Sequence, residues 1–140
     1  MRWFFDTSVL IPVFMEDHQH HEASLAAFVA ADKKQACCAA HSLAELYSVL
    51  TRLPGNRLSG EQVFLFLEAI EEHLSLITLD SREYYSAIRE AAGVGIVGGM
   101  LYDALLARCA RKAAAEVIYT WNLQHFRRLG PEIAKRIKTP

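Results

Sequence analysis

Asp103 is an acidic residue in a helical stretch where its neighbours on the same side are small and apolar. Leu106, Ala107 and Ala110 follow it at helical spacing. Arg108 and the other nearby basic residues project to other sides, so none neutralises it. A carboxylate facing a core costs on the order of several kcal/mol unless it is paired or bound to a cation. Asp103 therefore predicts a partner, and the alternatives are a distant arginine or exposure on a misjudged face.

Asp6 and Glu45 are two further candidate acids, and each also has a structural interpretation. Asp6 opens a stretch of residue types that commonly cap helices. Ser42 and Glu45 have the S-x-x-E spacing of a capping box, in which the two side chains satisfy the first backbone amides of a helix. Taken singly, the two interpretations of Asp6 are evenly balanced, and capping is favoured for Glu45.

Considered together, Asp6, Glu45 and Asp103 indicate a metal site. They come from three separate segments, each expected to end near one edge of a sheet. Converging carboxylates repel one another unless a hard cation lies between them. Oxygen ligands without convergent histidine or cysteine favour Mg²⁺ or Mn²⁺ over zinc. Asn122 offers a further neutral oxygen.

The elements that must position these acids alternate along the chain. Short apolar segments predict strands at residues 2–5, 35–40, 74–79 and 116–119. Helices are predicted from residue 8 and at residues 20–31, 43–53, 59–73, 80–92 and 100–114, with a short one around Phe126. Asp80 and Glu83 form a capping box and are assigned a structural role. This alternation predicts an α/β fold, a three-layer α/β/α sandwich with a central, mostly parallel sheet in which ligands bind beyond the strand ends.

Composition places the chain in a broad class without identifying its function. Its 140 residues are 52% hydrophobic, which suits one domain spanning residues 1–140. No apolar stretch is long enough to cross a bilayer and the N-terminus does not resemble a signal peptide, so we expect a cytoplasmic protein. The net charge of −1 does not indicate a nucleic-acid binder, so RNA binding would depend on local patches and bound metal. Three cysteines are interpreted as reduced and buried: Cys37, Cys38 and Cys109.

Four segments, in order, resemble the motifs of the PIN-domain family, specifically its VapC-type toxins. They are residues 5–8 with Leu10, residues 42–46, residues 102–107 and residues 119–126. The resemblance implies an acidic pocket that binds Mg²⁺ or Mn²⁺ and hydrolyses RNA phosphodiesters. Carried over by position, Asp6, Glu45 and Asp103 would be its metal-site residues. The supporting polar groups would be Thr7, Ser8 and Thr120.

The same resemblance implies partners, and one residue departs from the family pattern. It suggests an endoribonuclease toxin that is neutralised by a cognate antitoxin and forms a homodimer. Asn122 stands where many family members have a fourth acid, which keeps a second hypothesis open: a catalytically weak module that binds RNA or protein. Candidate RNA contacts, each of which is otherwise a solvated charge, are Arg52, Arg57, Arg127, Arg128 and the C-terminal Lys135, Arg136 and Lys138.

Three other patterns are given structural interpretations or left open. Gly93, Gly95 and Gly98 match a dinucleotide-binding motif, but they follow a predicted helix instead of a strand. The histidines at positions 18, 20 and 21 are expected in a solvated loop or helix start. The helix at residues 59–73 is apolar over much of its circumference, which predicts either burial on two sides or contact with a second subunit or antitoxin.

Overall fold

The computed structural model describes residues 1–140 and is built around a five-stranded parallel sheet. The strand order is β3-β2-β1-β4-β5, and every neighbouring pair is parallel. The strands are β1 (Trp3–Phe5), β2 (Ala36–Ala39), β3 (Ser75–Ile77), β4 (Val117–Tyr119) and β5 (Ile137–Lys138). The predicted strands are all present, and β5 is an addition that the sequence interpretation missed.

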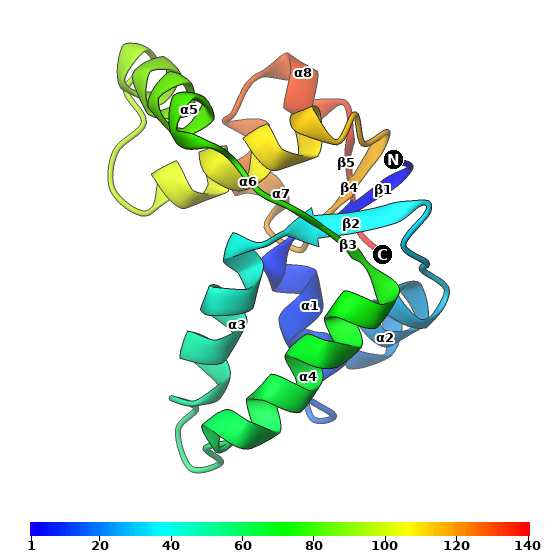
Figure 1. Cartoon of the computed structure of the whole chain (residues 1–140). Helices are drawn as coiled ribbons and strands as arrows, with labels where there is room; N and C mark the ends of the chain where they lie inside the picture. The colour runs from blue at the N-terminus through cyan, green and yellow to red at the C-terminus, as the bar shows by residue number, and fades with distance from the viewer.

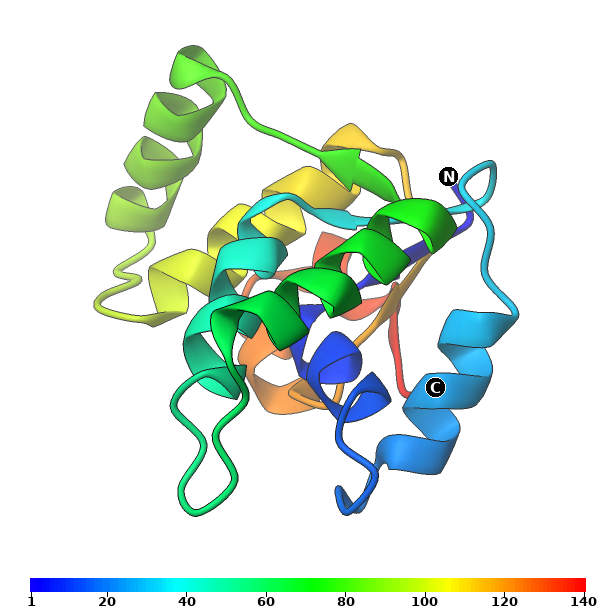
Figure 2. The same cartoon turned by 60° about the horizontal axis from the view of Figure 1, so that its bottom comes forward.

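Eight helices lie on the two sides of this sheet (Figure 1). One face carries α1 (Thr7–Val13), α2 (His21–Val29), α3 (His41–Leu50) and α4 (Gly60–His73). The other carries α6 (Met100–Lys112), α7 (Leu123–Arg127) and α8 (Pro131–Ala134), while α5 (Ser81–Gly93) packs against α6 away from the sheet. Figure 2 shows the same arrangement with α4 in front. The predicted three-layer α/β/α sandwich is confirmed.

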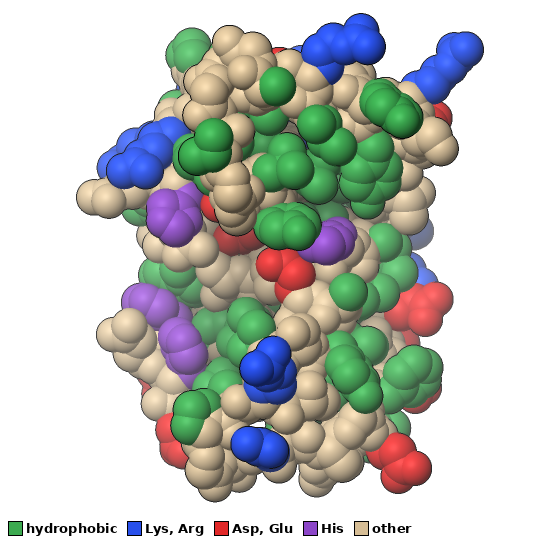
Figure 3. Space-filling model, turned by 90° about the vertical axis from the view of Figure 1, so that its left-hand side faces the viewer, with side chains coloured by type: hydrophobic (Ala, Val, Ile, Leu, Met, Phe, Trp, Pro, Cys, Tyr) green, Lys and Arg blue, Asp and Glu red, His purple; other side chains and the backbone are tan.

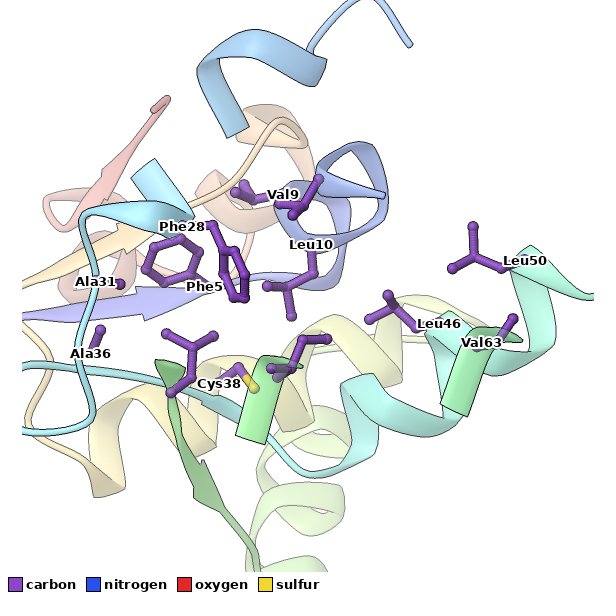
Figure 4. Close-up of a cluster of buried hydrophobic side chains, with 13 residues drawn as sticks. Phe5, Val9, Leu10, Phe28, Ala31, Ala36, Cys38, Leu46, Leu50 and Val63 are labelled. Atoms are coloured by element: carbon purple, nitrogen blue, oxygen red, sulfur yellow. The ribbon is translucent and has the colours of Figure 1, made fainter. Parts of the chain in front are cut away.

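Side chains that alternate along the strands contribute to two hydrophobic cores, one on each face of the sheet. Phe5 and Cys38 face the layer of α1 to α4, where they pack in one cluster with Leu10 and Phe28 (Figure 4). The adjacent residues on the same strands, such as Phe4, belong to the opposite cluster beneath α6, α7 and α8. Successive side chains of a strand point to opposite faces, so even these short strands pack against both helix layers. All three cysteines are buried and free, as predicted.

Helix α3 begins earlier than predicted, which changes the interpretation of its first turn. Its first residue is His41 and its N-cap position is Ala40, with no capping hydrogen bond from a side chain. Ser42 therefore lies inside the helix, and the capping-box interpretation of Ser42 and Glu45 is wrong. The second predicted box is confirmed, because Asp80 accepts from the Glu83 amide at 2.8 Å and Glu83 accepts from the Asp80 amide at 3.1 Å.

Helix α4 buries only one side. Val63 and Ile70 are fully buried, whereas Phe64 and Leu65 are 59% and 65% exposed. Burial on two sides within this chain is therefore excluded, and the partner interpretation stays open. The glycine-rich segment follows helix α5 and leads into α6. It does not follow a strand, which agrees with the prediction that it is not a dinucleotide-binding motif. No helix is both long and apolar enough to cross a bilayer.

Candidate active site

The carboxyl ends of the parallel strands bring the predicted acids to one edge of the sheet. Asp6 directly follows β1, and Thr120 directly follows β4, whose last residue pairs with the last residue of β1. Glu45 lies in the first turns of α3 after β2, and Asp103 in the first turn of α6. Figure 3 shows acidic side chains in a hollow in the middle of the molecular face at this edge, flanked by histidines and hydrophobic side chains.

Asp6 is held by two hydroxyl groups and does not cap α1 with its side chain. It occupies the N-cap position of α1 without a capping hydrogen bond. Ser8 Oγ donates to Asp6 Oδ2 at 2.6 Å, and Thr120 Oγ1 donates to the same oxygen at 2.8 Å. Burial raises the pKa of Asp6, which is 2% exposed, and these two hydrogen bonds oppose that rise. Oδ1 has no side-chain partner.

The two hydroxyls are themselves oriented by backbone amides just past β4. The amide of Trp121 donates to Ser8 Oγ at 2.9 Å, and the amide of Asn122 donates to Thr120 Oγ1 at 3.0 Å. A hydroxyl has one proton to donate. The hydroxyl oxygens of Ser8 and Thr120 each accept from an amide, which leaves their protons free to be donated to Asp6. The chain after β4 thus fixes the orientation of the Asp6 carboxylate.

A second network ties α1 to α3 around Glu45. Thr7 Oγ1 lies 2.7 Å from Ser42 Oγ and donates to Glu45 Oε1 at 3.0 Å. Thr7 and Ser42 are buried, whereas the Glu45 side chain is 34% exposed. Ser42 therefore supports Thr7, and Thr7 in turn holds the carboxylate of Glu45 toward α1.

Asp103 is the acid whose ionisation is most affected by its surroundings. Its side chain is 21% exposed, and its Oδ2 lies 3.6 Å from Nδ1 of His125. Burial raises the pKa of Asp103 to about 6, and the negative charges of Asp6 and Glu45 add to the rise while His125 opposes it. The three acids therefore lie within one another's electrostatic influence, although they come from different segments. Their roles as ligands remain predictions.

Two histidines near these acids were not anticipated from the sequence. His41 Nε2 lies 3.9 Å from Glu45 Oε1, and the His41 ring stacks on Tyr102 with ring centroids 5.5 Å apart and planes 4° apart. The i,i+4 spacing of His41 and Glu45 could have revealed this contact. The approach of His125 to Asp103 depends on how α7 packs against α6, which no local pattern encodes.

The remaining predicted residues are exposed, except Arg136, which is half-buried. Asn122 is exposed, occupies the N-cap position of α7 and makes no side-chain cap. Four arginines are exposed and form no ion pair: Arg52, Arg57, Arg127 and Arg128. Their contact with RNA remains a prediction. In contrast, Lys135 and Arg136 are both paired with Glu132.

The three histidines of the segment between α1 and α2 contact neighbouring protein groups. His20 stacks on Trp121 with centroids 3.7 Å apart, and His21 Nδ1 lies 2.7 Å from the carbonyl oxygen of Pro12. His18 Nδ1 accepts a hydrogen bond from the His20 amide at 3.0 Å. The cluster lies in the turn before α2 and at the first residue of that helix, as expected, but its rings are half-buried and packed instead of solvated.

The donor set fits a hard divalent cation in its chemistry but is not arranged as a ligand cage. The candidate donors are carboxylate oxygens, the ligands that Mg²⁺ and Mn²⁺ prefer. No group of three or more His, Cys, Asp or Glu side chains is arranged so that it could hold a metal ion. Glu45 is instead turned to Thr7 and Asp103 to His125.

Comparison with known proteins gives consistent matches. The PIN domain family model matches residues 3–130. Ribonuclease VapC27 of Mycobacterium tuberculosis is 40% identical over 113 residues, which cover 80% of this chain and 79% of that protein. Ribonuclease VapC40 of the same species is 34% identical over 114 residues, which cover 81% of each protein.

Two solved structures share the fold. The crystal structure of Mycobacterium tuberculosis VapC20, described as a Sarcin-Ricin loop cleaving toxin, matches with a TM-score of 0.71 at 13% identity, covering 88% of this chain and 92% of that one. VapBC2 from Rickettsia felis, bound to a DNA fragment from its promoter, matches with a TM-score of 0.66 at 18% identity, covering 99% and 98%. At these identities the likeness concerns the fold alone.

Proposed function

The chain belongs to the PIN-domain family, and from this premise we propose that it is a metal-dependent endoribonuclease, the toxin of a toxin–antitoxin pair. The observation that carries the proposal is the gathering of Asp6, Glu45 and Asp103 at the carboxyl edge of the sheet, where burial raises the pKa of Asp103 and the charges of the other two acids add to that rise. Placing a buried carboxylate, that of Asp6, and two partly buried ones near one another is unfavourable without a compensating cation. Similarity to two ribonucleases supports the choice of RNA as substrate.

Each acid would have a defined place in this site. Asp6 would offer Oδ1 to Mg²⁺ or Mn²⁺, because its Oδ2 is already engaged by Ser8 and Thr120. Glu45 and Asp103 would supply the other carboxylate oxygens, from α3 and α6. Asn122 would add a neutral oxygen at the end of β4. Thr7 would support Glu45 as it does in the structure.

Hydrolysis would then proceed at a phosphodiester held over these residues. A divalent cation bound there would activate water and offset the negative charge that develops on the phosphoryl oxygens. One carboxylate would accept the proton that the attacking water loses. The exposed arginines at positions 52, 57, 127 and 128 would contact flanking phosphates, which compensates for a net charge that does not itself favour nucleic acid.

The partner proposal follows from the solved relative and from α4. VapBC2 from Rickettsia felis, a structure with this fold, is bound to a DNA fragment from its promoter. On this chain, the exposed side chains of Phe64 and Leu65 on α4 are candidates for coverage by an antitoxin segment or a second copy of the chain. We expect a cognate antitoxin and a homodimer.

The direct test is cleavage of RNA by the purified chain with Mg²⁺ or Mn²⁺ and with EDTA. The proposal predicts cleavage only with the metal, and its loss in Asp103→Asn without loss of the fold. Asp17→Asn is the matched control, because Asp17 is exposed and lies in the turn between α1 and α2. Equal cleavage by wild type and Asp103→Asn would point to a contaminating nuclease. Binding of RNA without any cleavage would favour the alternative, a catalytically weak binding module.

A further inference from the structure

A small pocket lies beside the acidic residues and is not used by the proposed hydrolysis. It has a volume of about 150 Å³ and lies just beyond the carboxyl ends of β2 and β3, between the first turns of α3 and α5 and one face of α6. His41, Thr78, Tyr84 and Leu105 are among its lining residues. Ligands of open parallel sheets bind at this edge, so the pocket is in the region where substrate would lie.

The pocket is connected to the acids through His41 and α6. His41 lines the pocket, stacks on Tyr102 and lies 3.9 Å from Glu45. Tyr102 directly precedes Asp103, and Leu105 follows Tyr102 at the i+3 spacing that places two residues on one helix face. A ligand in the pocket would therefore lie next to a phosphodiester held at the carboxylates.

The lining chemistry fits a flat, neutral group. Seven of the nine lining residues are hydrophobic, and none is Asp, Glu, Lys or Arg, so nothing there would recognise a phosphate. Tyr84 is 39% exposed at the pocket and Tyr102 is 50% exposed beside it, which leaves aromatic surface available. The polar groups are few: the His41 ring and the hydroxyls of Thr78 and Tyr84. Proteins bind unpaired nucleobases with this combination of aromatic stacking and sparse hydrogen bonding.

We propose that this pocket binds one unpaired base of the RNA substrate, the base of a nucleotide flanking the bond that is cut. The inference rests on the proposed function for the identity of the ligand. Tyr84 and His41 act as specificity-determining residues, because they contact the base and leave the reacting phosphate to the carboxylates. Paired RNA cannot present a base in this way, so the pocket selects single-stranded segments.

The test compares two neighbouring tyrosines on α5. Tyr84 lines the pocket, whereas Tyr85 is 75% exposed and does not. With a single-stranded RNA oligonucleotide that the wild type cuts, Tyr84→Ala should raise KM about tenfold, the typical loss of one base stack, and leave kcat nearly unchanged. Tyr85→Ala should leave both constants unchanged. Equal KM values for the two variants would overturn the proposal.

A second arm uses the RNA instead of the protein. An abasic nucleotide is placed in turn at each position flanking the cleaved bond. In the wild type, one position should raise KM about tenfold, and that penalty should disappear in Tyr84→Ala because the base contact is already lost. Abasic penalties that are the same in wild type and Tyr84→Ala would show that the base lies elsewhere.

Two further outcomes separate this inference from its premise. If the wild type cuts no RNA, the proposed hydrolysis fails. The pocket is then tested by measuring the affinity of the same oligonucleotides by fluorescence polarisation. One abasic position should weaken binding to the wild type and have no further effect on binding to Tyr84→Ala. Should Tyr84→Ala weaken inhibition by the antitoxin while RNA affinity and KM stay unchanged, the pocket takes an apolar side chain of the protein partner, and the base-binding proposal is overturned.

Discussion

The hydroxyl of Thr120 donates a hydrogen bond to Oδ2 of Asp6 across 2.8 Å, joining two residues that are 114 positions apart. The contact exists because β1 and β4 are parallel neighbours whose last residues, Phe5 and Tyr119, are in register. Each of the two polar residues directly follows its strand. The position of the most buried acid in the site is therefore set by strand pairing.

Thr120→Val should weaken metal binding and cleavage while the fold is kept. The substitution preserves the shape of a fully buried side chain but removes the hydroxyl that orients Asp6. Loss of a group that orients a metal ligand typically lowers affinity or activity by about 10- to 100-fold. Cleavage rates measured over a range of Mn²⁺ concentrations would show this as a higher metal requirement. Thr120→Ser keeps a hydroxyl and should retain most activity, and a Thr120→Val protein with wild-type metal dependence would contradict the assigned role.

The contribution of Asp103 to the stability of the metal-free protein should fall as the pH rises from about 4 to 7. Burial raises the pKa of Asp103 from 3.8 to about 6, so the folded state holds its proton more tightly than the unfolded state does. The stability that this proton contributes is complete below about pH 4 and is lost as pH rises through about 6, a change of about 2 to 3 kcal/mol. The pKa of Asp6 is also raised, so its contribution to stability likewise falls as the pH rises.

Urea unfolding in EDTA would measure this dependence. Asp103→Asn should have a shallower fall in unfolding free energy with pH and should be more stable than wild type at neutral pH, because the substitution removes an unfavourable charge. Addition of Mn²⁺ should stabilise the wild type and have little effect on the variant. A variant that is less stable than wild type at neutral pH without metal would show that the charge of Asp103 does not destabilise the folded state.

Much of the fold could be predicted because it is encoded locally. Buried strands followed by polar residues, and helices bounded by caps such as Ser59, are visible as periodicity and spacing. Strand β5 has only two residues, Ile137 and Lys138, and α8 has one turn, so neither has a periodic pattern. The first turn of α3 was misassigned because Ser42 and Glu45 have capping-box spacing, yet Thr7 engages both side chains instead.

The candidate site was predictable in its acids but not in its connections. Asp6, Glu45 and Asp103 could be chosen because each follows a strand or interrupts an apolar helix face. The contacts of Asp103 with His125 and of Asp6 with Thr120 depend on long-range packing between separate segments. Spacing in a single sequence does not specify such pairs, whereas the i,i+4 pair of His41 and Glu45 is visible in the sequence.

Asp80→Ala should lower stability without lowering activity. Asp80 resembles the candidate acids in following a strand, but its carboxylate caps α5 by accepting from the amide of Glu83. Removing such a cap costs about 1 kcal/mol. Thermal unfolding and cleavage assays on the same preparation would separate the two effects. A folded Asp80→Ala protein with strongly reduced cleavage would mean that this acid had been assigned wrongly.

Leu65→Ser on α4 should reduce association of the chain with its proposed partners, an antitoxin or a second copy of the chain. Leu65 is 65% exposed, and a partner that covers it would gain the free energy of burying an apolar side chain, about 1.5 to 3 kcal/mol. Sedimentation of the chain alone and with its antitoxin would show which association weakens. Val97→Ser is the control, because Val97 is 80% exposed in the loop before α6. Equal behaviour of the two variants would exclude this part of α4 from an interface.

Binding of Mn²⁺ to the wild-type chain and to three single variants tests the central claim most directly. The variants are Asp6→Asn, Glu45→Gln and Asp103→Asn, and binding is followed by calorimetry together with the electron paramagnetic resonance signal of free Mn²⁺. If the three carboxylates hold one cation, the wild type binds Mn²⁺ and each folded variant loses most of that affinity. Folded variants that bind Mn²⁺ as tightly as the wild type would contradict the account.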